Sequence, residues 1–206
     1  MQIKVCGLKY PENISDILET NVDYLGMIFH PQSARFVSSA NNYKNIPNAK
    51  KVGVFVNKSA DEIINFHKDY QFNTVQLHGN ENNDLVIELK NKGLNVWKAF
   101  GVDIHFNFDI LNNFPDVDAF LFDTFTTQHG GSGKKFDWQI LQGKTFTKNF
   151  WLSGGISLED AEELQNFYHP NCIGLDINSK FELEPGLKDV QKIKEFKQKI
   201  NQSLNS

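Results

Sequence analysis

Short apolar segments alternate with segments of helical period along the whole chain. Eight of the apolar segments are rich in β-branched and aromatic residues, and several are continuous, as in strands buried on both faces of a parallel sheet. They are IKVCG from Ile3, YLGMIF from Tyr24, KVGVFV from Lys51, TVQLHG from Thr74, NVWKAF from Asn95, AFLFDT from Ala119, NFWLSGG from Asn149 and CIGLDI from Cys172. Eight strands alternating with helices over 206 residues predict an α/β fold, a (β/α)8 (TIM) barrel, with residues 1–206 forming a single domain.

The main alternative is an open, doubly wound sheet. No GxGxxG turn follows the first strand, and the number of strands suits closure, so the barrel is favoured. Start signals mark the helical segments between the strands: Ser59 and Glu62 form a capping box, and Ser157 caps a segment with acidic residues in its first turn. The helical pattern is weakest at 41–49 and 137–143, where we expect short or irregular turns.

Composition excludes several classes of partner. The net charge is −4 with a pI of about 5.9, so the chain lacks the basic surface that binds nucleic acid or anionic membranes. No apolar segment reaches the roughly 18 residues of a membrane span, and the N-terminus has no apolar signal segment. Two cysteines, Cys6 and Cys172, fit a reducing compartment. We therefore expect a cytoplasmic protein, and a monomer.

Arginine is used only once. Of the 21 basic residues, Arg35 is the single arginine, and it lies in the segment HPQSARFVS after the second strand. Arginine differs from lysine in its rigid planar fork of donors, which binds a carboxylate or phosphate in bidentate fashion and stacks on aromatic rings. Arg35 is thus a candidate for binding an anionic substrate, the alternative being an arginine in a solvated loop.

Catalytic residues of such barrels lie where the strands end, at the C-terminal face. Cys6 ends the first strand and Asp123 the sixth. A thiolate can accept a proton from carbon, and an aspartic acid whose pKa is raised in a dry site can donate one to oxygen. The alternatives are a small buried hydrophobic residue for Cys6 and a capping carboxylate for Asp123. Cys172, early in its strand, is assigned to the core.

Two glycines at the end of the seventh strand suggest an anion site. Gly154 and Gly155 precede a helix start, where backbone N–H groups and the helix dipole favour a phosphate. Asn178 and Ser179, after the eighth strand, could add donors. The alternative is a tight turn between strand and helix.

Asp176 ends the eighth strand at the same face and is a candidate for binding the substrate, and His78 ends the fourth. His78 lines the pocket or is a hydrogen-bonded structural residue. The glycine-rich loop after Asp123, with Gly130, Gly131 and Gly133, is a candidate lid or a plain surface loop. The histidines and cysteines lack the spacing of a metal site, and the GxSxG and HExxH motifs are absent, so no metal is expected.

With these residues in place, the chain resembles the phosphoribosylanthranilate isomerases over nearly its whole length. The matching segments, in order, are KVCGLK, FHPQSARFV, VQLHG, LFDTFTTQHGGSGKKFDW, LSGGI and GLDINSKFE. The long segment around Asp123 is the most specific of them, and KVCGLK is next.

The resemblance implies a (β/α)8 fold without a cofactor. The implied activity is the Amadori rearrangement of N-(5'-phosphoribosyl)anthranilate, a phosphorylated sugar, to 1-(2-carboxyphenylamino)-1-deoxyribulose 5-phosphate in tryptophan biosynthesis. It implies that Cys6 is the general base and Asp123 the general acid, and that Arg35 faces the anthranilate carboxylate. The amides of Gly154, Gly155 and Ser179 would bind the phosphate.

Three positions depart from the family pattern, and two other functions stay open. Ala34 replaces the usual proline before Arg35, and Asn178 and Lys180 stand where serine and glycine are usual. A related sugar-phosphate isomerase would be favoured by an aspartate at the end of the first strand, where Cys6 stands. A catalytically silent barrel that binds phosphorylated ligands would have no need of both Cys6 and Asp123.

Overall fold

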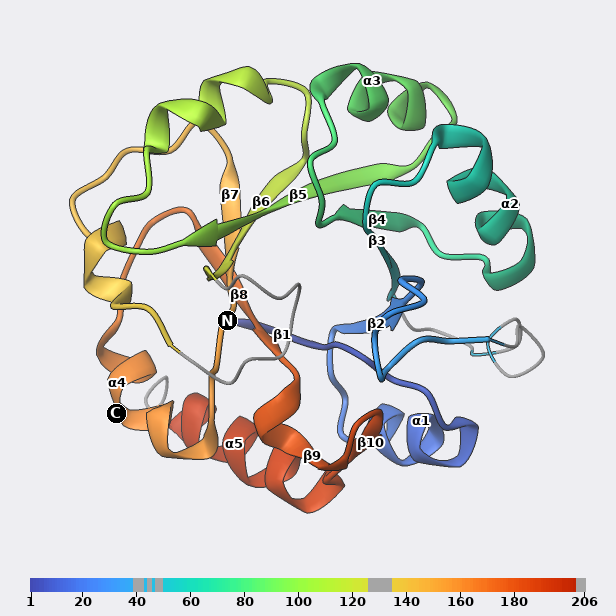
Figure 1. Ribbon diagram of the computed structural model, residues 1–206. Coiled ribbons are helices and arrows are strands. Elements are labelled where there is room, and N and C mark those ends of the chain that lie inside the picture. The colour runs from blue at the N-terminus through green and yellow to red at the C-terminus, as the bar shows by residue number, and fades with distance from the viewer. Residues whose placement is uncertain (39–42, 44–45, 47–49, 126–134, 203–206) are drawn as a thin grey trace.

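The protein is described from a computed structural model that covers residues 1–38, 43, 46, 50–125 and 135–202. Eight parallel strands close into a barrel in chain order, and the last strand pairs with the first (Figure 1). They are β1 (Gln2–Val5), β2 (Tyr24–Ile28), β3 (Lys50–Phe55), β4 (Thr74–Leu77), β5 (Asn95–Val102), β6 (Ala119–Thr124), β7 (Asn149–Leu152) and β8 (Cys172–Ile177). Each overlaps one of the eight apolar segments, so the predicted (β/α)8 barrel is confirmed.

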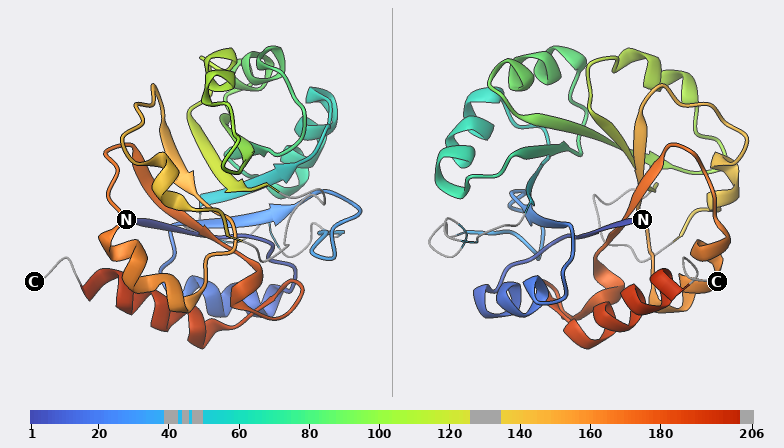
Figure 2. Two further views of the ribbon diagram at one scale, coloured as in Figure 1. Left: turned by 60° about the vertical axis from the view of Figure 1, so that its left-hand side comes forward. Right: turned by 180° about the vertical axis from the view of Figure 1, so that it is seen from behind.

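Helices surround the barrel. The α-helices are α1 (Pro11–Leu18), α2 (Ala60–Tyr70), α3 (Asn83–Asn91), α4 (Ala161–Asn166) and α5 (Val190–Gln202). Helices α1 and α5 lie side by side outside β1 and β8 (Figures 1 and 2). The 3₁₀ helices are η1 (Phe108–Asn113), η2 (Trp138–Leu141), η3 (Leu158–Asp160) and η4 (Ser179–Phe181).

Local sequence explains where several of these helices begin. The Glu62 amide donates to Ser59 Oγ at 3.4 Å, and the Ser59 amide donates to Glu62 Oε2 at 2.9 Å, so the predicted capping box is present. Before α4, the Ser157 amide donates to Asp160 Oδ2 at 2.8 Å, and the first turn is the 3₁₀ helix η3. Of the two segments with a weak helical pattern, 137–143 contains the short helix η2, whereas most of 41–49 lies outside the described residues.

The eighth strand leads into an antiparallel pair that the sequence pattern did not predict. Strands β9 (Glu182–Glu184) and β10 (Leu187–Lys188) follow η4 and precede α5. In the described part of the chain, every helix is too short or too polar to serve as a membrane span.

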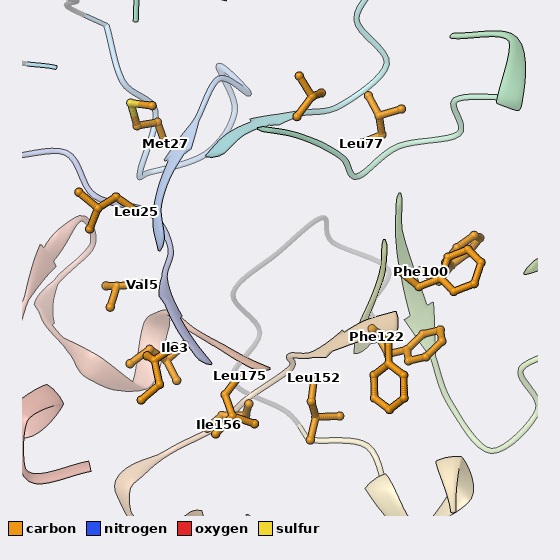
Figure 3. Packing of buried hydrophobic residues seen from close by; sticks show 14 of the residues in the cluster. Ile3, Val5, Leu25, Met27, Leu77, Phe100, Phe122, Leu152, Ile156 and Leu175 are labelled. Carbon is orange, nitrogen blue, oxygen red and sulfur yellow. The ribbon is translucent and has the colours of Figure 1, made fainter. Parts of the chain in front are cut away.

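The main hydrophobic core lies between the strands and the helices. Side chains of Ile3, Val5, Leu25, Met27 and Leu175 are buried there, on the outer side of the barrel (Figure 3). Each such aliphatic side chain contributes roughly 1.5–3 kcal/mol by leaving water. Because side chains alternate along a strand, the residues between them face the barrel interior.

The barrel interior has an aromatic floor with a polar layer above it. Tyr24, Trp97 and Trp151 pack together with ring centroids 4.9 to 5.1 Å apart. Toward the C-terminal end, Lys4 Nζ donates to Gln76 Oε1 and to Asp176 Oδ1, both at 2.9 Å, and its side chain is fully buried. The buried ammonium therefore joins β1, β4 and β8.

We predict that Lys4→Met destabilises the protein by about 3–5 kcal/mol, because it leaves the buried Asp176 carboxylate without its cation. Urea unfolding at pH 7 measures the change. The control Lys92→Met, at an exposed lysine, should stay within about 0.5 kcal/mol of wild type. The double variant Lys4→Met/Asp176→Leu should regain most of the loss. If Lys4→Met is as stable as the control, the ion pair does not stabilise the barrel.

Candidate active site

Cys6 directly follows β1 at the C-terminal mouth of the barrel, where a glycine on the next strand makes room for it. A Cβ atom on Gly26 of β2 would lie 2.8 Å from Cys6 Sγ and 2.9 Å from its Cα. Burial raises the pKa of the Cys6 thiol, whereas the ammonium groups of Lys4 and Lys188 lower it. Burial outweighs these two cations, and the Asp176 carboxylate adds to its effect, so the pKa of the thiol is raised overall.

Asp123 lies near the C-terminal end of β6, and its side chain is 21% exposed. Burial raises the pKa of this carboxyl to about 6, although a hydrogen bond from the Thr124 amide and the charge of Lys4 oppose the shift. The Thr124 amide donates to Oδ1 at 2.8 Å. Asp123 therefore has a carboxyl group that can carry a proton much nearer neutral pH than an ordinary aspartate.

His78 follows β4 and lies beside Asp123, with its Nε2 atom 3.5 Å from Asp123 Oδ2. Its Nδ1 atom contacts Gln76 Nε2 at 3.1 Å, so this residue both lines the site and is held by a hydrogen bond. Burial, followed by the charges of Lys98 and Lys4, lowers the pKa of His78 to about 4, so the imidazole is neutral at pH 7.

Asp176 was expected to reach a ligand from the end of β8. It is buried, and its Oδ1 atom accepts a hydrogen bond from Lys4 Nζ. Burial raises the pKa of this carboxyl, and the Lys4 ammonium opposes the shift. The hydrogen bond that the structure shows for the Asp176 side chain is therefore with Lys4. The polar layer brings the predicted residues Cys6, His78, Asp123 and Asp176 into one interacting group around this lysine.

Arg35 uses its planar fork on a carboxylate of the protein itself. Its Nε atom donates to Glu182 Oε1 at 2.9 Å and to Oε2 at 3.1 Å, and Nη2 donates to Oε2 at 2.6 Å. The bidentate geometry predicted for Arg35 is present, but its Nε–Nη2 edge holds Glu182. Nη1 donates to none of the described residues. The side chain runs over Gly7, where a Cβ would lie 2.6 Å from Arg35 Cδ.

Lys188, in the β9–β10 pair, connects Asn178 to Glu182, the partner of Arg35. Lys188 Nζ donates to Asn178 Oδ1 at 2.7 Å and to Glu182 Oε1 at 2.5 Å. Burial lowers the pKa of Lys188 to about 8, against the attraction of Glu182. The side-chain oxygen of Asn178 is thus bound by Lys188, so its Nδ2 group is what remains for a ligand.

Gly154 and Gly155 form the turn after β7. Gly154 and Gly155 have φ angles of 87° and 69°, a region that favours glycine. A Cβ on Gly154 would also lie 2.3 Å from Thr124 Oγ1 and 3.0 Å from Asp123 Oδ1, so this turn packs against the acid. The amides of Gly154, Gly155 and Ser179 donate to no described residue, which leaves three N–H groups for an anion.

A cavity of about 510 Å³ opens beside Asp123 and His78, on the side of β4, β5 and β6. Its other walls include Phe100, Phe106 and Phe114. This volume suits a small organic ligand, and the aromatic walls suit an apolar ring. Cys6, Arg35 and Gly154 lie outside the cavity lining.

One predicted feature of the site falls outside the described residues, and four residues of the site were not predicted. The candidate lid with Gly130, Gly131 and Gly133 falls outside the described residues. No group of three or more His, Cys, Asp or Glu side chains suited to a metal is found within the described ranges. Sequence reasoning missed Lys4, Gln76, Glu182 and Lys188. Alternation along β1 and β4 could have identified the first two, because it places them on the same face as Cys6 and His78.

Comparison with known proteins identifies relatives of this chain. Residues 3–199 match the family model described as N-(5'-phosphoribosyl)anthranilate (PRA) isomerase. A protein of Parabacteroides distasonis named N-(5'-phosphoribosyl)anthranilate isomerase is 41% identical, over 97% of this chain and 93% of its own length.

Two solved structures extend the comparison. The phosphoribosylanthranilate isomerase of Thermotoga maritima is 31% identical, with a TM-score of 0.86 over 98% of this chain and 99% of its own. Another phosphoribosylanthranilate isomerase structure, in complex with reduced 1-(o-carboxyphenylamino)-1-deoxyribulose 5-phosphate, is 28% identical. The TM-score is 0.82, and the match covers 98% of this chain and 99% of the chain in that structure.

We predict that the Asp123 carboxyl titrates with a midpoint near pH 6, about two units above an ordinary aspartate. Carboxyl ¹³C NMR of protein labelled at aspartate and glutamate measures it, and Asp123→Asn identifies the signal. Glu62 serves as an internal reference of opposite sign, because hydrogen bonds from Lys58 and Ser59 lower its pKa to about 2. A midpoint near pH 4 for Asp123 would show that burial does not raise its pKa.

Proposed function

This chain belongs to the phosphoribosylanthranilate isomerase family and isomerises N-(5'-phosphoribosyl)anthranilate in tryptophan biosynthesis, and we propose that Cys6 and Asp123 perform its two proton transfers. The observation that carries this proposal is their pairing at one barrel mouth. A carboxyl group with a pKa of about 6 and a thiol flanked by two ammonium groups share that mouth. The reaction moves a carbonyl along a sugar chain, so it requires an acid for oxygen and a base for carbon.

Asp123 acts first, as the general acid. In its protonated form it donates to the ring oxygen of the aminoribose, the C1–O bond breaks, and the open chain carries a protonated Schiff base. At pH 7 about one Asp123 in ten carries the necessary proton, against roughly one in a thousand for an ordinary aspartate. Burial thus makes this acid available under physiological conditions.

Cys6 acts second, as the general base. Its thiolate removes the proton from carbon 2, and the electron pair moves to neutralise the iminium nitrogen, giving an enolamine. Tautomerisation yields the ketone of 1-(2-carboxyphenylamino)-1-deoxyribulose 5-phosphate. Lys4 and Lys188 support this role because their positive charges favour the thiolate. Each transfer by a positioned group is worth about 10² to 10⁴ in rate.

The substrate phosphate is proposed to bind at the amides of Gly154, Gly155 and Ser179. Two observations support this proposal. The three N–H groups donate to no described residue, and the positive φ angles of the two glycines let the backbone approach an anion closely. Asn178 could add its Nδ2 group from the neighbouring loop. Binding the phosphate here would place the sugar between β7 and the Cys6–Asp123 pair.

Arg35 is proposed to bind the anthranilate carboxylate through Nη1, while Glu182 holds the other edge of its guanidinium. A guanidinium fixed in this way loses little side-chain entropy when a second carboxylate binds. Its side chain lies over Gly7, the residue that follows Cys6 in the chain. Arg35 would then select the aromatic acid and take no part in proton transfer.

We propose a cytoplasmic location and a monomeric state. The free thiols of Cys6 and Cys172 support a reducing compartment. Analytical ultracentrifugation of the purified chain tests the monomer, and a dimer at micromolar concentration would contradict it.

We predict that Cys6→Ala and Asp123→Asn each lower kcat by at least about 10²-fold, because each removes one proton transfer. Affinity for reduced 1-(o-carboxyphenylamino)-1-deoxyribulose 5-phosphate should stay within about tenfold, since the binding groups are unchanged. Loss of substrate fluorescence measures turnover, and Cys172→Ala, which changes the other cysteine, is the matched control. Substantial activity in either variant removes that residue from its proposed role.

We predict that Arg35→Lys weakens binding of the same product analogue by about tenfold or more, since a charged hydrogen bond is worth about 1.5–3 kcal/mol. An analogue without the ring carboxylate should lose less than about threefold. Isothermal titration calorimetry compares the two ligands. Equal losses for both would mean that Arg35 supports the fold of the site rather than the carboxylate.

A further inference from the structure

A chain of polar contacts crosses the barrel interior to Asp123. It runs from Lys4 Nζ to Gln76 Oε1 at 2.9 Å, from Gln76 Nε2 to His78 Nδ1 at 3.1 Å, and from His78 Nε2 to Asp123 Oδ2 at 3.5 Å. Lys4 and Gln76 are buried and lie below the reacting groups, so neither is a direct participant in the chemistry. What this series of polar contacts can control is the position of a proton.

Lys4 fixes the orientation of the Gln76 amide. An ammonium group only donates hydrogen bonds, so the atom of Gln76 that faces it must be the carbonyl oxygen. The ion pair with Asp176 keeps this lysine charged and in place. The amide nitrogen of Gln76 is therefore turned toward His78, and a flipped amide would set two donors against each other.

The oriented amide in turn fixes the proton of His78. An amide nitrogen donates and cannot accept, so the Nδ1 atom it faces must be the unprotonated ring nitrogen. The ring is neutral at pH 7, because burial and the charges of Lys98 and Lys4 outweigh those of Asp176 and Glu81. A neutral imidazole with bare Nδ1 carries its only proton on Nε2.

That proton faces Asp123. Once Asp123 has given its own proton to the substrate, Oδ1 accepts from the Thr124 amide, and Oδ2 has the Nε2–H group of His78 before it. A separation of 3.5 Å is long for a hydrogen bond, and such contacts commonly shorten when substrate binds. The opposite tautomer would present a bare Nε2, which would accept the Asp123 proton and compete with the sugar oxygen for it.

We propose that Gln76 is a positioning residue of the isomerase: anchored by Lys4, it fixes His78 as the Nε2–H tautomer, which supports the Asp123 carboxylate and cannot take its proton. This inference rests on the proposed role of Asp123 as the general acid. It gives the segment VQLHG, which holds all of β4 except Thr74, a function through two residues that point into the barrel.

Nitrogen NMR tests the first half directly. In ¹⁵N-labelled wild-type protein at pH 7.5, two-bond ¹H–¹⁵N spectra distinguish a protonated ring nitrogen from a bare one, and His78→Asn identifies the signals. We expect Nε2 protonated and Nδ1 bare. A protonated Nδ1 in the wild-type protein overturns the proposal.

The variant Gln76→Glu tests the second half. Its carboxylate accepts from Nδ1–H, so the His78 proton should move to Nδ1, and kcat should fall on the order of 10²-fold. KM should change by less than about threefold, and Gln142→Glu, the same substitution at an exposed position, should leave both unchanged. Gln76→Met, which offers no donor or acceptor, should show both tautomers and a smaller loss of kcat, and it serves if the first variant does not fold.

A double variant separates positioning from a structural role. In a His78→Asn background, Gln76→Glu should change kcat by less than about threefold, because its effect passes through the missing ring. A full loss in that background overturns the proposal. An active Asp123→Asn variant would instead overturn the general-acid assignment, and with it the catalytic half of this inference, even where His78 carries its proton on Nε2.

Discussion

The buried ion pair between Lys4 and Asp176 is the interaction on which the barrel interior depends. A lone ammonium among apolar side chains would cost several kcal/mol, so the interior must supply partners for it. It supplies a carboxylate from β8 and an amide oxygen from β4, and the three strands are thereby held at one height in the barrel. The aromatic floor of Tyr24, Trp97 and Trp151 keeps water out from below.

Glycines next to the reacting groups help to position them, because a larger residue at these sites would not fit. Gly26 leaves the space that the Cys6 thiol fills, and Gly154 lets the turn after β7 lie against Asp123. Both contacts are too close for any other residue. Burial of the Asp123 carboxyl group, whose side chain is 21% exposed, is what raises its pKa.

Much of what depends on local pattern could be predicted from the sequence, although the β9–β10 pair was missed. The eight strands, the capping box of α2 and the location of Cys6 and Asp123 at strand ends all follow from periodicity and from the rule that barrel chemistry lies at the C-terminal face. The pairing of Arg35 with Glu182 could not be predicted in this way, because the two residues are 147 positions apart and meet only after the barrel closes. Alternation could have revealed Lys4 and Gln76, but it could not show which donor faces which acceptor.

The ion pair between Lys4 and Asp176 also has a consequence for the synthesis of the protein on the ribosome. Lys4 and Asp176 are 172 residues apart, so Lys4 has no carboxylate partner until the ribosome has made β8, roughly 10 to 30 s after β1 at ordinary translation rates. During that interval the edge of β1 that pairs with β8 is open, and an open strand edge is the kind of surface that recruits other chains. An inward-pointing charge discourages such pairing. Lys4, which later pairs with Asp176 in the barrel interior, is a charge of this kind in the nascent strand.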